Sequence, residues 1–164
     1  MPDKKIHIPF GKYFHSFVSD GEKERIKIDY FFNPEDGRVS ATVIFGPLAQ
    51  GPPNHAHGGA TASVLDESMG AVAWLNGFPV MTVRMTIDFL KAVKLNSELN
   101  VAAWIDRVDE NKVWLKSKIT DENGTVFVKA KGLFLKLPKE KFQKMGAIPD
   151  QFFEMNRFSF KHKL

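Results

Sequence analysis

The sequence of 164 residues contains no cysteine. This absence excludes disulfide bonds, a thiol nucleophile and metal sites built from thiolates, although it does not fix the cellular compartment. Long apolar runs are also missing, since no stretch approaches the roughly 18 apolar residues that a membrane-spanning helix needs. The N-terminal sequence Met-Pro-Asp-Lys-Lys carries charge without a following apolar core, unlike a secretory signal. We therefore expect a cytoplasmic protein with no membrane span.

Charge of either sign is present only in ordinary amounts. Lysine and arginine number 23 against 19 acidic residues, which gives a net charge of +4, and 43% of the residues are hydrophobic. These proportions are typical of a soluble globular protein. Binding to single-stranded nucleic acid would need basic side chains interleaved with exposed aromatic ones, whereas most aromatic residues here are expected to point inward. We expect no nucleic-acid partner.

Length and turn-forming residues predict one domain with two extensions. The predicted domain covers residues 25–137, with an N-terminal extension over 1–24 and a C-terminal extension over 138–164. The C-terminal extension includes four phenylalanines between positions 150 and 160. We expect it to pack on the domain or on a partner subunit. A role as a lid over a substrate channel is the alternative.

One long helix is predicted over residues 58–76. Its apolar residues recur at helical spacing, and Gly77 supplies a stop signal. The preceding residues 46–55 are rich in glycine and proline and cannot continue a sheet. A loop therefore leads directly into the helix. Two or three further helical turns are compatible with residues 139–145.

Six segments alternate between apolar and polar residues, as strands that bury one face do. Within one of them, the odd-numbered positions from Met81 to Phe89 are apolar and are expected to form the buried face. Short polar turns, including the favoured pair Asn123-Gly124, indicate antiparallel neighbours. The sequence therefore predicts an α+β domain in which a curved antiparallel sheet of about six strands wraps around the helix. The six segments are residues 25–33, 39–45, 80–90, 97–108, 112–121 and 125–137.

The tripeptide His57-Gly58-Gly59 stands at the predicted junction between loop and helix. The first amide groups of a helix have no intrahelical acceptor, and the helix dipole makes this end electropositive. Two glycines remove the Cβ atoms, so that a substrate carbonyl could approach these amides. The pattern suits stabilisation of an oxyanion. Glycines that only let the loop turn and pack closely are the alternative.

Asp66 stands in the middle of the predicted helix among apolar residues. At 100° per residue, Ala62, Met69 and Gly70 lie within about 60° of it around the helix axis. An acid at the border of an apolar stripe is a candidate for acid–base chemistry. A structural aspartate with a hydrogen-bond partner is the alternative.

The spacing between His57 and Asp66 predicts how the chain assembles. Nine residues correspond to about 13.5 Å of helix rise and about half a revolution beyond two full turns. The two residues of one chain therefore cannot act on one small substrate. If both are catalytic, two-fold symmetry would place the Gly-Gly amides of one chain opposite Asp66 of the other. We expect a homodimer, and the sequence does not decide whether dimers pair into tetramers.

Two further patterns are less specific. Thr82 is expected on the strand face opposite Met81, where it could orient a water molecule or the Asp66 carboxylate; an exposed threonine favoured by β-structure is the alternative. His55 and His57 form a His-x-His pattern that is compatible with a metal site. No third histidine or acid follows at ligand spacing in the loop, so we expect no metal.

Several short motifs occur in a fixed order within residues 38–137. They are Gly51-Pro52-Pro53, His57-Gly58-Gly59-Ala60, Leu65-Asp66, Val80-Met81-Thr82, Asp88-Phe89 and Lys131-Gly132-Leu133-Phe134. In this order and spacing the segment resembles the hotdog-fold acyl-CoA thioesterases, in particular the phenylacetate-pathway type and the thioesterase superfamily member 4 branch. The resemblance implies a hotdog fold and the association of two domains. It also implies hydrolysis of an acyl-CoA thioester at the dimer interface, with no cofactor beyond the coenzyme A of the substrate.

The resemblance further implies roles for individual residues. Asp66 corresponds to the catalytic carboxylate, acting as a general base on water or as a direct nucleophile. Gly59, together with Gly58, corresponds to the source of the helix amide that polarises the thioester carbonyl. His57 is expected to hold the loop and is a candidate contact for that carbonyl. Thr82 corresponds to the hydroxyl that positions the water.

Substrate binding involves a departure from the family and a requirement for cations. Many relatives carry an asparagine six residues before the histidine, where this chain has Gly51, and Asn54 is the candidate substitute. The phosphates of coenzyme A need a positively charged rim, for which Arg84 is a candidate. The other candidates are Lys91, Lys129 and Lys131.

Two other functions are compatible with this fold. A non-catalytic domain that binds acyl-CoA or regulates another protein would not need the carboxylate of Asp66. A hydratase or dehydratase would be expected to use a His–Asp pair in a different local motif. The combination of Gly58-Gly59 with Asp66 favours the thioesterase.

Overall fold

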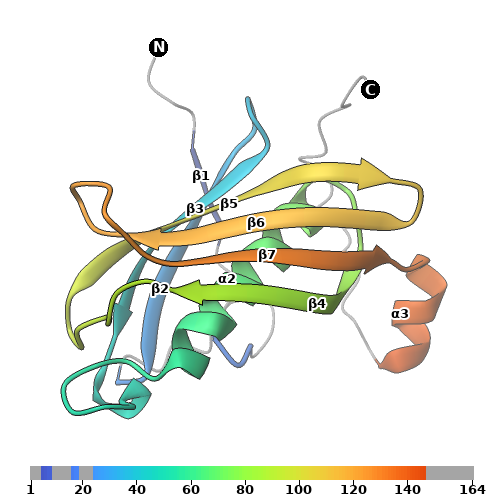
Figure 1. Ribbon diagram of the computed structural model, residues 1–164. Coiled ribbons are helices and arrows are strands. Elements are labelled where there is room, and N and C mark those ends of the chain that lie inside the picture. Colours follow the sequence, from blue (N-terminus) through green and yellow to red (C-terminus); the bar gives the residue numbers. More distant parts are fainter. Residues whose placement is uncertain (1–4, 9–15, 19–23, 147–164) are drawn as a thin grey trace.

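The computed structural model describes residues 5–8, 16–18 and 24–146. In this part of the chain, seven strands form one antiparallel sheet, and the long helix α2 lies across one face of it (Figure 1). The predicted α+β architecture, a curved antiparallel sheet around one long helix, is confirmed. The phenylalanine-rich segment between positions 150 and 160 lies outside the described residues, so its packing stays a prediction.

The sheet has the strand order β1-β2-β3-β5-β6-β7-β4. Strand β4 follows α2 in the sequence but pairs only with β7, so it forms one edge of the sheet. The chain that leaves the helix therefore becomes an edge strand. The strands are β1 (Ile6–Ile8), β2 (Ile26–Asn33), β3 (Arg38–Phe45), β4 (Val80–Phe89), β5 (Glu98–Asp109), β6 (Lys112–Thr120) and β7 (Val126–Lys136).

The six predicted strands correspond to β2 through β7, and the helical turns near residues 139–145 are α3 (Lys139–Met145). Strand β1 is the element that sequence patterning did not predict. It has only three residues, too few for an alternating pattern, and forms by pairing Ile6 with Phe32 of β2. The sheet therefore extends into the predicted N-terminal extension.

Helix α2 (Gly58–Leu75) forms the centre of the core. Its C-terminal end is closed by Asn76, whose Nδ2 donates to the carbonyls of Val72 at 2.7 Å and Gly37 at 2.8 Å. Burying each large apolar side chain of the helix contributes roughly 1.5–3 kcal/mol. Neither α2 nor any other helix in the described part of the chain is long and apolar enough to span a membrane. The fully buried side chains of α2 include Val64, Leu65, Met69, Val72 and Leu75.

Gly132 of β7 lets the sheet approach α2 closely. A Cβ atom at this position would lie 3.2 Å from Sδ of Met69 and 2.4 Å from Cε2 of Phe134. Both neighbours are buried, with at most 1% of their surface exposed. Because neither side chain has room to move away, only glycine fits between strand and helix here.

Strand β4 contains a β-bulge that the sequence did not predict. Its pairing with β7 shifts between Thr82 and Arg84, which leaves Val83 without a partner. The extra residue reverses the alternation, so that Thr82 before the bulge and Met85 after it face the same side. This side is that of the helix, since Met85 pairs with Gly132.

The expected buried face from Met81 to Phe89 is therefore wrong at three of its five positions, whereas Met85 and Ile87 are half-buried and pack against the core. Met81 is 45% exposed, Val83 55% and Phe89 57%. The physical reasons are the bulge, which breaks the single face into two, and the edge position of β4, which α2 covers incompletely. Strand β4 thus presents apolar side chains to solvent.

We expect Gly132→Ala to lower the free energy of unfolding by about 1–3 kcal/mol, because an added methyl group overpacks a filled core. Thermal and denaturant unfolding measure this effect. Gly146→Ala is the matched control, since nothing lies within 4 Å of a Cβ added there. Equal stability of Gly132→Ala and the parent would show that the close approach is not a constraint.

Candidate active site

The start of α2 is held by the loop before it. The 3-10 turn η1 (Pro47–Ala49) provides the carbonyl of Ala49, which accepts a hydrogen bond from the backbone N–H of His57 at 2.8 Å. Gly51 lies directly against His57, because a Cβ at Gly51 would be 2.8 Å from the Cα of His57. The glycine at position 51 therefore makes room for the histidine.

His57 is the N-cap residue of α2. Its Nδ1 accepts a hydrogen bond from the backbone N–H of Gly59 at 2.8 Å. A ring nitrogen that accepts carries no proton, so the neutral imidazole holds its proton on Nε2. The exposed side chain of His57 consequently presents an N–H donor beside the helix start.

The backbone N–H of Gly59 is therefore already used by the protein. The family resemblance assigns the carbonyl-polarising amide to Gly59 together with Gly58, whereas the N–H of Gly59 is engaged in the His57 cap. The N–H of Gly58 makes no hydrogen bond with any described residue. In this structure the open amide at the helix start is that of Gly58, next to Nε2–H of His57.

Asp66 and Thr82 are brought together by α2 and β4. Oγ1 of Thr82 donates to Oδ1 of Asp66 at 2.8 Å. The sequence left three interpretations for Thr82, and the structure shows the contact with the Asp66 carboxylate; the role of Thr82 stays a prediction. Oδ2 of Asp66 accepts no hydrogen bond from the described residues, so one oxygen of the carboxylate is available.

A hollow of about 360 Å³ lies beside the start of α2, and we call it the helix-start hollow. Gly58 and Thr61 contribute to one wall, while Phe89 and Lys91 contribute to another. The ring of Phe89 lies 3.3 Å from the position of a Cβ at Gly58, so the glycine permits this contact. The helix-start hollow combines the helix amide, an aromatic wall and a cation.

Asn54 and Arg84 are not gathered around the Asp66 carboxylate. Asn54 adopts a positive φ of 60° in the loop, where its backbone N–H donates to the side chain of Gln50 at 3.1 Å. Arg84 lies on the opposite face of the sheet from Thr82, in a separate hollow with Lys131. Their predicted roles in substrate binding stay predictions.

Sequence reasoning passed over Glu67, which adjoins Asp66. The hydroxyl of Tyr30 donates to Oε1 of Glu67 at 2.9 Å, and the hydroxyl of Ser16 donates to Oε2. The first bond ties α2 to β2 and the second ties it to residues 16–18, and together they fix the rotation of the helix. A second acidic residue in a helix that is otherwise apolar was the feature of the sequence that could have pointed to Glu67. Within the described ranges, no group of three histidine or acidic residues could hold a metal ion.

Comparison with known proteins relates this geometry to a family. The family model described as Thioesterase superfamily matches residues 53–128, from the loop before α2 into β7. Acyl-coenzyme A thioesterase THEM4 of Bos taurus is 32% identical over 112 residues, which are 68% of this chain and 46% of that protein. The chain spans about half the length of the curated relatives that it matches.

Solved structures share the fold. The thioesterase superfamily protein RHA08564 superposes with a TM-score of 0.64 and 29% identity, covering 66% of this chain and 53% of that one. BH2602 of Bacillus halodurans, solved with CoA, has a TM-score of 0.56 and 28% identity over 64% of this chain and 71% of its own. Sequence match, fold and the helix with His57 and Asp66 agree: residues 53–128 match the thioesterase superfamily, and the described domain has the hotdog fold.

Proposed function

We propose that the protein is an acyl-CoA thioesterase. The observation that carries the proposal is the hydrogen bond from Thr82 to Asp66, which orients a carboxylate and leaves one of its oxygens available. The same helix presents unused N–H donors at its start. A base and an electropositive site for a carbonyl oxygen are the two components that hydrolysis of a thioester needs. Curated relatives named acyl-coenzyme A thioesterases support this choice of substrate class.

In the proposed reaction, Asp66 acts as a general base. A water molecule attacks the carbonyl carbon of the thioester, and Oδ2 of Asp66 takes its proton. Thr82 holds the carboxylate through Oδ1 and thereby directs Oδ2 toward the water. The carbon–sulfur bond then breaks, and the proton on Asp66 passes to the departing sulfur. The products are a carboxylic acid and free coenzyme A.

The negative charge that develops on the carbonyl oxygen is assigned to the helix start. The N–H of Gly58 and Nε2–H of His57 are the donors available there, and the dipole of α2 adds to their effect. His57 thus has two functions, since Nδ1 caps the helix while Nε2 serves the substrate. Gly59 contributes indirectly, because its N–H fixes the tautomer of His57.

The two halves of this chemistry come from two copies of the chain in our proposal. Nine residues of α2 separate His57 from Asp66, and the two positions point to different sides of the helix. Strand β4 is an edge with exposed Met81, Val83 and Phe89. An apolar free edge is a surface that another chain can cover by strand pairing. Two-fold pairing of β4 would bring the helix start of one copy toward the partner's Asp66.

Coenzyme A is assigned to the helix-start hollow. Its thioester end must reach the amide of Gly58, which lines that hollow together with the apolar ring of Phe89. Lys91 in the same lining can pair with a phosphate. Of the four cations named from the sequence, Lys91 is the one that lines this hollow. BH2602, which is 28% identical to this chain, was solved with CoA, and this supports coenzyme A as the class of ligand.

We expect Asp66→Asn to lower kcat for thiol release by about 10²- to 10⁴-fold, because the amide cannot accept the proton. Short-chain, long-chain and aromatic acyl-CoA thioesters are assayed, which also defines the acyl preference. Asp88→Asn is the matched control, since Asp88 lies on the same strand as Thr82 but pairs with Lys129 at 3.7 Å. Parental turnover by Asp66→Asn on every substrate would refute the proposed base.

The two functions of His57 are separated by two substitutions. His57→Ala is expected to lower the free energy of unfolding by about 1 kcal/mol through loss of the cap, and to lower kcat as well. His57→Asn restores a capping acceptor and so restores stability, but it does not reach the position of Nε2 and leaves kcat low. Unfolding curves and steady-state kinetics measure both effects. Parental kcat in His57→Asn would limit His57 to the cap.

Disruption of the β4 edge tests the dimer. Val83→Asp places a charge on the exposed bulge residue and is expected to give monomers without thioesterase activity, as seen by sedimentation velocity and kinetics. Leu48→Asp is the matched control, because Leu48 is 65% exposed but lies in η1. A parent protein that is monomeric and fully active would contradict the shared site.

A further inference from the structure

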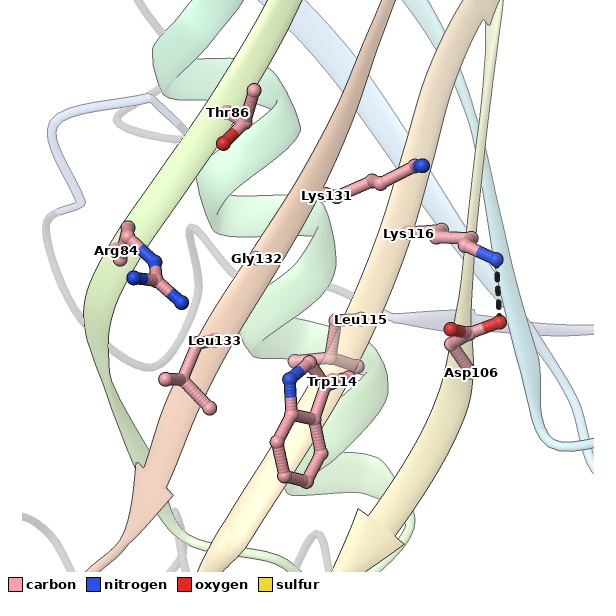
Figure 2. Close-up of a pocket in the computed structure, with 9 residues that line it drawn as sticks. All are labelled: Arg84, Thr86, Asp106, Trp114, Leu115, Lys116, Lys131, Gly132 and Leu133. Atoms are coloured by element: carbon pink, nitrogen blue, oxygen red, sulfur yellow. Dashed lines mark hydrogen bonds and ion pairs between the residues drawn. The ribbon is translucent and has the colours of Figure 1, made fainter.

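The outer face of the sheet, turned away from α2, carries a second hollow of about 130 Å³, which we call the outer hollow. It spans the neighbouring strands β4, β7, β6 and β5. Figure 2 shows Arg84, Lys131 and Trp114 on the near side of these strands, with α2 behind them. The sheet therefore separates the outer hollow from the Thr82–Asp66 pair.

Cations on this face stand opposite one another. Lys116 of β6 is the cross-strand partner of Lys131 of β7, and Lys118 is likewise the partner of Lys129. Directly opposed like charges destabilise an antiparallel sheet. If this surface were needed only for solubility, an acidic residue opposite each lysine would give the same solubility and a more stable sheet. Lys129 is paired with Asp88 at 3.7 Å, so the opposed lysines that call for a further anion are Lys116 and Lys131.

Protein carboxylates balance only part of this charge. Nζ of Lys116 lies 2.6 Å from Oδ1 of Asp106, as the dashed line in Figure 2 marks. Among the described residues, no carboxylate lies within 4.0 Å of the charged groups of Arg84 or Lys131. The lining of the outer hollow consequently carries three cations and one anion, and two of these cations have no acidic partner within the described part of the chain.

The side chains around these two cations fit an anion with several oxygens. The guanidinium of Arg84 can donate two parallel hydrogen bonds, while Lys131 supplies a point charge. The hydroxyl of Thr86, the cross-strand neighbour of Lys131, is a further donor. Trp114 and Leu133 add apolar walls that lower the local dielectric constant and strengthen these contacts.

Other occupants match the outer hollow less well. A second copy of the chain would bring its own unpaired cations against Arg84 and Lys131, so the two faces would repel. An acyl chain would remove the same cations from water without giving them a partner. Charge complementarity therefore favours a small polyanion.

We propose that the outer hollow binds the phosphoryl group of a small molecule. The phosphoryl oxygens bridge Arg84 on β4 and Lys131 on β7, and their charge relieves the repulsion between Lys131 and Lys116. Two sources carry this chemistry: the nucleotide end of coenzyme A and a free phosphorylated metabolite. The proposal does not require thioesterase activity, since binding is measured without turnover.

Isothermal titration calorimetry of the full chain with inorganic pyrophosphate and with ADP tests the site. We expect Lys131→Gln to weaken both ligands about tenfold, because one charge-assisted contact is lost. Lys112→Gln is the matched control, since Lys112 lies on the same face of β6 but does not line the outer hollow. In phosphate-free buffer, Lys131→Gln is expected to raise the melting temperature by about 1–3 °C, because it removes a like-charge pair.

Failure of the parent to bind pyrophosphate, or equal binding by Lys131→Gln, would overturn the proposal. Competition then identifies the source of the phosphoryl group. If pyrophosphate inhibits thiol release competitively in the parent but not in Lys131→Gln, the outer hollow is assigned to coenzyme A. Binding that leaves the KM for acyl-CoA unchanged would assign it to a free metabolite. If no thioester is hydrolysed, calorimetry still decides the proposal, so its failure is distinguishable from failure of the proposed function.

Discussion

The β-bulge at Val83 is the constraint on which the composition of both faces of the sheet depends, because it decides which side chains of β4 lie on each face. In a regular strand, Thr82 and Arg84 would lie on one face. The extra residue turns Thr82 toward α2, where its hydroxyl reaches Asp66, and turns Arg84 outward beside Lys131. A single inserted residue in one edge strand therefore supplies groups to opposite faces of the sheet.

The position of Asp66 depends in turn on how α2 is held. Gly132 sets the distance between helix and sheet, because a side chain there would collide with Met69. The bonds of Glu67 to Tyr30 and Ser16 set the rotation of the helix about its axis. Packing at Gly132 and the hydrogen bonds of the neighbouring Glu67 thus place the Asp66 carboxylate against β4, as a site built on rigid elements requires.

Local periodicity was sufficient to predict α2 and the strands β2 to β7, because each has enough residues for a repeating pattern. It failed where the decisive interaction is not local. The apolar positions from Met81 to Phe89 read as one face, and only the register with β7 shows that the face is broken. Likewise, the motif around His57 indicated an open helix start, but the rotamer of the histidine decides which amide is open. The chemical roles of these residues stay predictions.

The edge position of β4 links the proposed chemistry to the proposed dimer. A bulge in a central strand would disturb pairing on two sides, whereas here only the pairing with β7 is interrupted. The same edge position leaves the apolar side chains of Met81 and Val83 in solvent. Because one side of β4 has no neighbouring strand, β4 can contain a bulge and can also pair with another chain. In the proposed dimer, pairing would cover the side chains that the bulge exposes and would bring a second helix start toward the Thr82–Asp66 pair, so the dimer and the site would have one structural cause.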